Sequence, residues 1–182
     1  MVIVNVGPTT VEGLWQRLYL FPYGRASILF VVVAGIGMGL FLRARPTGPR
    51  RSATLLWRAA VLLLGGLALQ TLTSDVGVIL PIYGLLFLAV LLLQRLPPAA
   101  VITLAAMLSV AGPVLFINHG ATEQAGAHPR LVQLGDPAGQ VVHGLVLSGR
   151  YPLVTWAVPF LLGMWIAHLD LTRRTVVHRL LL

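Results

Sequence analysis

The sequence contains no cysteine and no lysine, and only 10% of its 182 residues are charged. The lack of cysteine excludes a disulfide scaffold, thiolate metal sites and a cysteine nucleophile. The lack of lysine excludes the phosphate-binding loop that ends in lysine, and no Gly-x-Ser-x-Gly nucleophile turn is present. Soluble domains carry about 25% charged residues, so a water-soluble protein with a single core is also excluded. A membrane protein is the class that remains.

Apolar residues make up 57% of the chain, and the mean hydropathy is +0.88. A helix needs about 20 mainly apolar residues, and at least roughly 17, to cross the hydrocarbon core of a bilayer. Five stretches reach that length, so we expect an all-α, polytopic integral membrane helix bundle that forms one domain over residues 1–182. The five expected spans are residues 26–42, 55–72, 76–93, 99–117 and 153–169.

Short apolar pieces at both ends predict two further, partial helices. Residues 1–6 are too short to cross a membrane, and they lack the basic leader and small-residue cleavage site of a secretory signal. Residues 176–182 resemble the opening of another helix. We therefore expect the chain to be part of a longer protein whose first helix begins upstream.

Thirteen arginines against five acidic residues give the chain a net charge of +8. The arginines lie between the apolar stretches and form no continuous stripe, so we interpret them as a signal of topology and expect no nucleic acid partner. Nine of the thirteen lie in or beside alternate loops, which share one side of the membrane, and the largest group lies within residues 43–58. The positive-inside rule places those loops in the cytoplasm and residues 118–152 in an extracytoplasmic loop.

Small residues within the spans predict close helix packing. Gly35 and Gly39 lie one turn apart, and Gly65 and Gly66 occur together in the next expected span. Glycine at such positions lets the backbone of a neighbouring helix approach closely. We favour helix packing over a ligand site as the role of these glycines.

Many of the remaining polar residues map to the extracytoplasmic ends of the expected helices or to the loops there. Ionisable and polar groups are costly at membrane depth, so these residues are candidates for one substrate-binding cavity. Ordinary interface residues are the alternative interpretation. Arg25 carries a planar guanidinium that can hold a carboxylate, phosphate or carbonyl oxygen. The candidates for substrate binding are Asn5, Tyr23, Arg25, Ser27, Tyr83, Arg150 and Tyr151.

Two histidines in or beside the long extracytoplasmic loop are candidates for a catalytic base. Imidazole accepts a proton near neutral pH, so His119 or His143 could deprotonate an attacking hydroxyl or amine. We prefer His143 because an apolar run that returns to the membrane follows it, whereas a Gly/Ala-rich segment follows His119. A solvated loop histidine is the alternative for each. His119, Glu123 and His128 lack a regular ligand spacing, so we expect no metal site.

Four short motifs follow one another along the chain. They are residues 1–5, residues 23–37 beginning Tyr-Gly-Arg-Ala-Ser, residues 80–87, and residues 149–152 (Gly-Arg-Tyr-Pro) followed by 160–164. In this order they resemble bacterial membrane proteins related to the heparan-alpha-glucosaminide N-acetyltransferase catalytic domain. Those proteins belong with the YeiB-like family in a wider transmembrane acyltransferase superfamily. Family members often have histidine at the position of Tyr23, and they usually begin with an Asp-x-x-Arg-Gly segment that this chain lacks.

The resemblance implies a membrane-embedded acyltransferase. The implied donor is acetyl-CoA or another acyl-CoA in the cytoplasm, and the implied acceptor is extracytoplasmic, for example a saccharide. We expect a multi-pass protein of the bacterial cell (plasma) membrane that contacts the lipid bilayer. The alternative is a non-catalytic membrane component, such as a transporter fragment or a small assembly subunit. A homo-oligomer or a larger membrane complex is compatible with either function.

Overall fold

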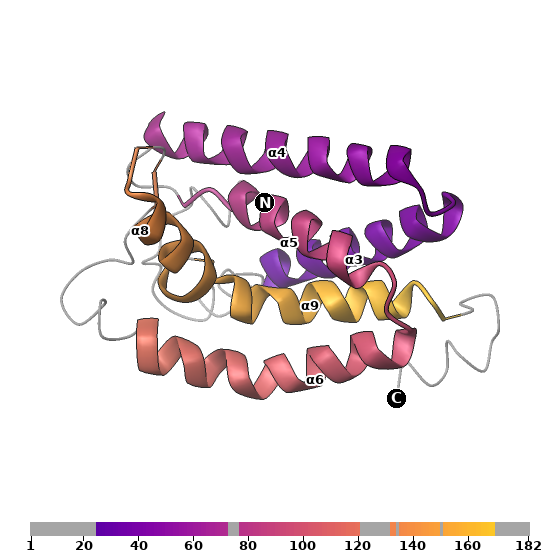
Figure 1. The fold of residues 1–182 in the computed structure, drawn as a ribbon. Coiled ribbons are helices and arrows are strands. Elements are labelled where there is room, and N and C mark those ends of the chain that lie inside the picture. Colours follow the sequence, from indigo (N-terminus) through magenta and orange to yellow (C-terminus); the bar gives the residue numbers. More distant parts are fainter. Residues whose placement is uncertain (1–24, 73–76, 121–131, 134, 150, 170–182) are drawn as a thin grey trace, which may run out of the picture.

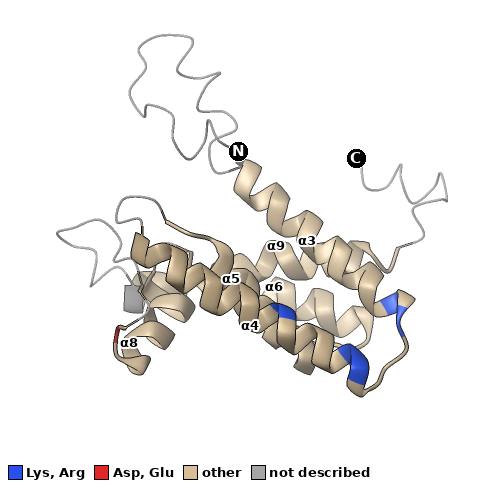
Figure 2. Ribbon diagram, turned by 90° about the horizontal axis from the view of Figure 1, so that it is seen from above, with Lys and Arg blue, Asp and Glu red and all other residues tan. Residues whose placement is uncertain are grey.

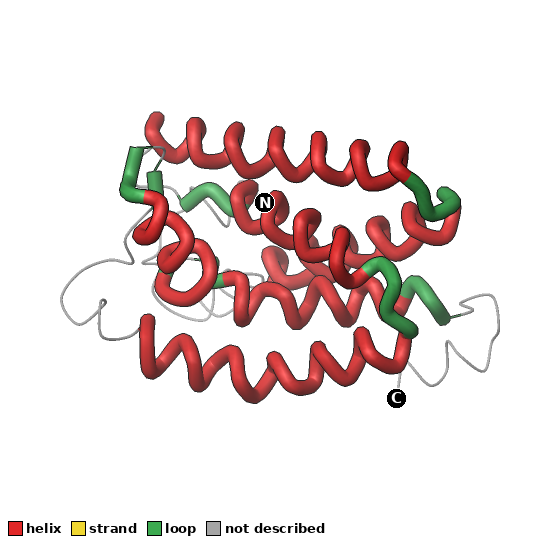
Figure 3. The backbone as a smooth tube through the Cα atoms, in the orientation of Figure 1, coloured by secondary structure: helices red, strands yellow, loops and turns green. Residues whose placement is uncertain are grey.

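The computed structural model describes residues 25–72, 77–120, 132–133, 135–149 and 151–169. Within these residues it contains six α-helices and two π-helical turns, so the expected all-α class is confirmed. The five longest helices run back and forth between the two ends of a bundle (Figure 1). Figure 3 shows that the loops gather at those two ends.

The bundle is built from α3 (Arg25–Ala44), α4 (Pro49–Leu72), α5 (Leu80–Leu93), α6 (Pro98–Leu115) and α9 (Leu153–Ile166). Three smaller elements lie between α6 and α9 in the sequence: η1 (Phe116–Gly120), α8 (Ala138–His143) and η2 (Gly144–Ser148). These three elements all lie at the end of the bundle where α4 finishes and α5 begins (Figure 1).

Prolines mark the starts of the bundle helices. Pro49 and Pro98 are the first residues of α4 and α6, Pro81 lies in the first turn of α5, and Pro152 precedes α9. Proline suits these positions because its fixed φ matches the helix and the first turn needs no backbone N–H donor.

Three helices are long and apolar enough to cross a membrane. They are Ala26–Ala44, Pro49–Leu72 and Pro98–Asn118. A fourth candidate span combines Ala138–Ser148 with Leu153–Ile166, and the two parts are bent by 57° at the break between them. These three or four candidate spans indicate an integral membrane protein.

The expectation of five full spans is not met within the described residues. Helix α5 has 14 residues, so at about 1.5 Å per residue it is shorter than the hydrocarbon core of a bilayer. Residues 77–79, which we expected inside this span, are not helical. Helix α9 also has 14 residues and reaches span length only together with the bent segment before it. The expected partial helices at both chain ends lie outside the described residues.

Apolar side chains are found both inside the bundle and on its outer surface. Phe160 and Met164 of α9 are buried beside Leu86 of α5, and the rings of Phe160 and Phe87 lie 6.5 Å apart. By contrast, the side chain of Leu72 is 82% exposed. The other highly exposed apolar side chains include Leu92, Val110, Ile117 and Trp57. Lipid would cover such a surface, which agrees with a membrane location.

Glycines bring α3 and α9 into backbone contact. A Cβ atom added to Gly163 would overlap the backbone oxygen of Val32, and one added to Gly35 would overlap the backbone oxygen of Phe160. Gly39 packs against α9 one turn further along. The predicted packing role of Gly35 and Gly39 is therefore confirmed.

Helices α4 and α5 also approach each other closely at glycine residues. A Cβ atom on Gly66 would lie 2.5 Å from the ring of Pro81, and one on Gly84 would lie 2.8 Å from Leu63. The space around Gly65 is open. Only the second glycine of the predicted Gly65–Gly66 pair therefore serves in helix packing.

A buried arginine joins α4 to its neighbours at the end where α3 finishes. Arg51 is 6% exposed, and its Nη1 donates hydrogen bonds to the carbonyl oxygens of Leu42 (3.1 Å) and Arg45 (3.0 Å). Its Nη2 donates to Thr47 Oγ1 (3.0 Å) and to Gln94 Oε1 (2.8 Å). Gln94 is the C-cap residue of α5. One guanidinium thus fixes the α3–α4 loop and the end of α5.

Replacing Arg51 by leucine is expected to lower the free energy of unfolding by about 2 kcal/mol, because four part-buried hydrogen bonds from a charged donor are lost. The neighbouring Arg50 is exposed, so Arg50→Leu is the matched control and should change stability by less than about 0.5 kcal/mol. Thermal unfolding in detergent, followed by tryptophan fluorescence, measures both variants. Equal stability of the two variants would contradict the bridging role of Arg51.

Candidate active site

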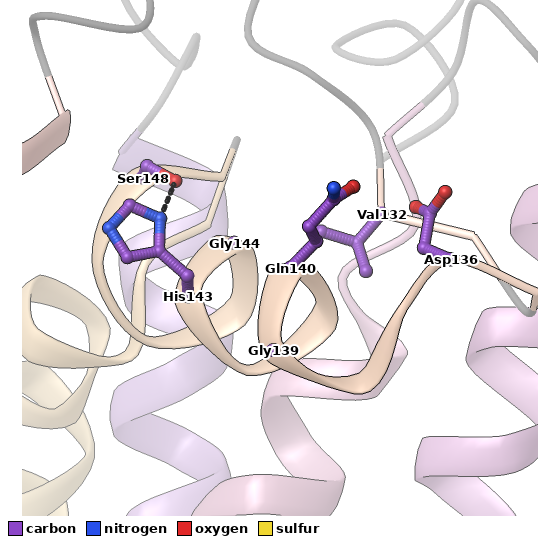
Figure 4. A pocket seen from close by; sticks show the side chains of 7 residues that line it. All are labelled: Val132, Asp136, Gly139, Gln140, His143, Gly144 and Ser148. Atoms are coloured by element: carbon purple, nitrogen blue, oxygen red, sulfur yellow. Dashed lines mark hydrogen bonds between the residues drawn. The ribbon is translucent and has the colours of Figure 1, made fainter.

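A polar pocket lies at the end of the bundle opposite the arginine-rich α3–α4 loop. Figure 2 shows the blue arginine segments along α4 and at the α3–α4 loop, and the red acidic segment beside α8 at the other end. The pocket has a volume of about 490 Å³, which is within the usual range for small-molecule sites. Its lining residues are Val132, Asp136, Gly139, Gln140, His143, Gly144 and Ser148 (Figure 4).

A tight turn builds one wall of the pocket. Gly135 has φ of +126°, in the left-handed region that glycine adopts without strain. The Asp136 carboxylate accepts a hydrogen bond from the Gln133 N–H (3.0 Å), which closes the turn. Pro137 is the N-cap of α8, and its carbonyl oxygen accepts a hydrogen bond from the Gln140 N–H (2.8 Å).

The π-helical turn η2 forms the opposite wall and sets the position of Ser148. In this turn the Gly149 N–H donates to the Gly144 carbonyl oxygen five residues earlier, at 2.6 Å. The wider turn places residues five apart above one another, and such turns are frequent at functional sites. Ser148 is therefore brought over His143, and its Oγ lies 3.0 Å from His143 Nδ1.

The hydroxyl and the imidazole form a pair suited to proton transfer. With the ring proton on Nε2, the Ser148 hydroxyl donates its hydrogen bond to Nδ1; with the ring proton on Nδ1, that N–H donates to Ser148 Oγ and the basic lone pair is on Nε2. A hydroxyl within hydrogen-bond reach of a histidine is the arrangement found in sites for nucleophilic and general base catalysis. Ser148 is buried, His143 is half-buried, and Asp136 adds a carboxylate to the same pocket.

Of the residues predicted from the sequence as catalytic, His143 is the one whose side chain is placed in the pocket (Figure 4). The backbone of His119 lies in η1, and η1 packs against η2. The two histidine-bearing segments therefore lie at the same end of the bundle.

The predicted substrate-binding residues are only partly placed. Tyr83 is half-buried and packs against the hydrophobic core, and the Tyr151 ring makes an edge contact with Trp156 at 5.4 Å. Ser27 is half-buried in the first turn of α3, and the backbone of Arg25 begins that helix. Neither Tyr83, Tyr151 nor Ser27 lines the described pocket. Asn5, Tyr23 and Arg150 lie outside the described residues.

Sequence reasoning missed Asp136, Gln140 and Ser148. Ser148 follows His143 by five residues. In an α-helix, which has 3.6 residues per turn, side chains five residues apart would lie on different faces. Only the π-helical turn brings the two together, and hydropathy gives no signal for such a turn. The Gly135–Asp136–Pro137 sequence is a recognisable turn signal that could have drawn attention to Asp136.

In the part of the chain that the structure describes, no group of three acidic or histidine side chains is placed to hold a metal ion. No family model, curated protein or solved structure matches the chain. The pocket, the helices and the distribution of charge are therefore the basis for a functional assignment.

Proposed function

We propose that this protein is a membrane-embedded acyltransferase that transfers an acyl group, such as acetyl, to a hydroxyl or amine acceptor. The observation that carries the proposal is the His143–Ser148 pair in a polar pocket at one end of an apolar helix bundle. The motif order that resembles the heparan-alpha-glucosaminide N-acetyltransferase-related proteins supports the same reaction class. That resemblance also makes an acyl-CoA the proposed donor and a saccharide the proposed acceptor.

His143 acts as the general base in this proposal. As the acceptor oxygen or nitrogen forms its bond to the acyl carbon, His143 Nε2 takes the acceptor's proton, the thioester carbon–sulfur bond breaks, and the CoA thiolate leaves. This step requires the thioester end of the acyl-CoA to reach the pocket from the cytoplasmic end of the bundle. Ser148 positions the ring through its hydrogen bond to Nδ1. The pocket volume of about 490 Å³ has room for an acceptor of one sugar ring.

The distribution of arginine between the two ends of the bundle supports placing the acyl donor at one end and the acceptor at the other. All six arginines whose side chains are described lie in α3, α4 or the loops at their shared end and at the α5–α6 turn. The positive-inside rule assigns that end to the cytoplasm, where an acyl-CoA is available. The pocket then opens on the extracytoplasmic side of the bacterial plasma membrane.

Reconstituted vesicles test the proposed reaction. The full-length protein in sealed liposomes should transfer radiolabel from acetyl-CoA to glucosamine or a related amino sugar, above the level of protein-free liposomes. Protein that binds neither substrate and transfers no label, across a panel of sugars and amines, would instead favour a non-catalytic membrane component.

A further inference from the structure

Five exposed arginines cluster at the end of the bundle away from the pocket, and they lack acidic partners among the described residues. Of the chain's five acidic residues, Asp136 is the one with a described side chain, and it lies beside α8 at the other end (Figure 2). The exposed arginines are Arg43, Arg45, Arg50, Arg58 and Arg95. The buried Arg51 is a separate case because four protein acceptors already take its Nη donors.

Two of these arginines share one aromatic ring. The guanidinium carbon of Arg45 lies 5.3 Å from the centre of the Phe41 ring, and that of Arg58 lies 5.2 Å from it. Each contact is a cation–π interaction, which holds the guanidinium plane in place. Both charges stand close to the same ring, within roughly the Debye length of about 10 Å at 0.1 M salt, so they repel each other. An anion between or beside them would relieve that repulsion.

The pair lies near the end of the bundle where α3 finishes and α4 begins. Phe41 is in the last turn of α3, Arg58 is in the third turn of α4, and both helices are candidate membrane spans. Trp57 is 71% exposed beside Arg58, as expected for an aromatic side chain at a membrane interface. Further along α4, Val61 and Leu64 are exposed apolar side chains that an acyl chain can cover.

We propose that Arg45 and Arg58, which both contact the Phe41 ring, bind the phosphate headgroup of an anionic phospholipid. Guanidinium groups bind phosphate oxygens through paired, charge-assisted hydrogen bonds, and clusters of arginine at the cytoplasmic end of membrane helices attract anionic lipids. A lipid is the occupant that fits, because the phosphate site is continuous with an exposed apolar surface on α4. The site does not depend on the proposed acyltransferase activity.

Two double variants that remove the same charge distinguish a specific lipid-binding site from non-specific electrostatic attraction to anionic lipid. Arg45→Gln with Arg58→Gln removes the pair on Phe41, whereas Arg50→Gln with Arg95→Gln removes two exposed arginines that have no described contact with that ring. Native mass spectrometry of each protein, purified with equal amounts of phosphatidylglycerol and phosphatidylcholine, measures the lipid that is retained. Thermal unfolding confirms that both variants are folded.

The native protein and the Arg50/Arg95 variant should retain phosphatidylglycerol over phosphatidylcholine. The Arg45/Arg58 variant should lose about tenfold of that preference, because it alone loses the charge-assisted hydrogen bonds to the lipid phosphate. Replacing both residues by lysine should restore only part of it, because lysine keeps the charge without the planar guanidinium. Equal losses in the two glutamine variants would overturn the site. So would a native protein that binds inorganic phosphate as tightly as the lipid, or one that shows no lipid preference.

Discussion

Replacing His143 by alanine is expected to lower the rate of acyl transfer by about 10² to 10⁴-fold, the contribution of a positioned general base. The imidazole lines the polar pocket, and its Nδ1 is held by the Ser148 hydroxyl at 3.0 Å. In the proposed reaction, an acceptor without this base would have to lose its proton to water while it attacks the acyl carbon. Substrate binding should change much less, so the loss should appear in kcat and only weakly in KM.

His168 provides a matched control for that experiment. It is an exposed histidine at the far end of α9, where its Nδ1 lies 2.9 Å from the Met164 carbonyl oxygen. His168→Ala should retain the native rate of acyl transfer. Ser148→Ala should lower the rate less than His143→Ala does, because the base remains and only its orientation is lost. Its KM should stay close to the native value.

His119 determines how a His143→Ala variant that retains acyl transfer is interpreted. His119 lies in η1, which packs against η2, so it could replace His143 as base in a single variant. Transfer that persists in a His119→Ala, His143→Ala double variant would exclude a histidine base at this end of the bundle. Tyr23 would then be the next candidate.

Replacing Gly163 by alanine is expected to lower the free energy of unfolding by about 3 kcal/mol, the upper part of the usual range for overpacking. The added methyl group would overlap the backbone oxygen of Val32 and lie 3.0 Å from the backbone nitrogen of Ile36. Backbone atoms within a helix cannot move aside singly, so α3 and α9 would have to separate. Phe160 and Met164, which are buried near this contact, would then lose part of their packing.

Gly37 is the control on the facing helix. Nothing lies within 4 Å of a Cβ atom added to it, so Gly37→Ala should leave stability unchanged or raise it slightly. Both variants can be compared by thermal unfolding in the same detergent. If Gly163→Ala proved as stable as Gly37→Ala, the close α3–α9 contact would be wrong.

Hydropathy and helix-end signals predicted most of the bundle. The expected spans 26–42 and 99–117 correspond closely to α3 and α6. The expected span 76–93 was too long because apolar composition alone does not show whether the backbone is helical. Pro81 was the local signal for the later start of α5, since proline favours the first turn of a helix.

The pocket was harder to predict because it depends on backbone geometry inside a segment expected to be a loop. His143 was found from its chemistry, whereas its partner Ser148 depends on the π-helical turn η2. Tyr83 and Tyr151 were predicted to bind substrate because they are polar residues near helix ends. Their rings pack against the hydrophobic core, where the apolar body of tyrosine is favoured, and a role in substrate binding stays a prediction.

The orientation of the bundle is tested most directly by cysteine labelling, since the native chain has no cysteine. Gln140 is an exposed residue of the pocket, and Arg50 is an exposed residue at the arginine-rich end. In right-side-out sealed vesicles, a membrane-impermeant maleimide should label Gln140→Cys, and it should label Arg50→Cys only after the vesicles are permeabilised. Labelling of Arg50→Cys but not of Gln140→Cys in sealed vesicles would place the pocket in the cytoplasm and contradict an extracytoplasmic acceptor site.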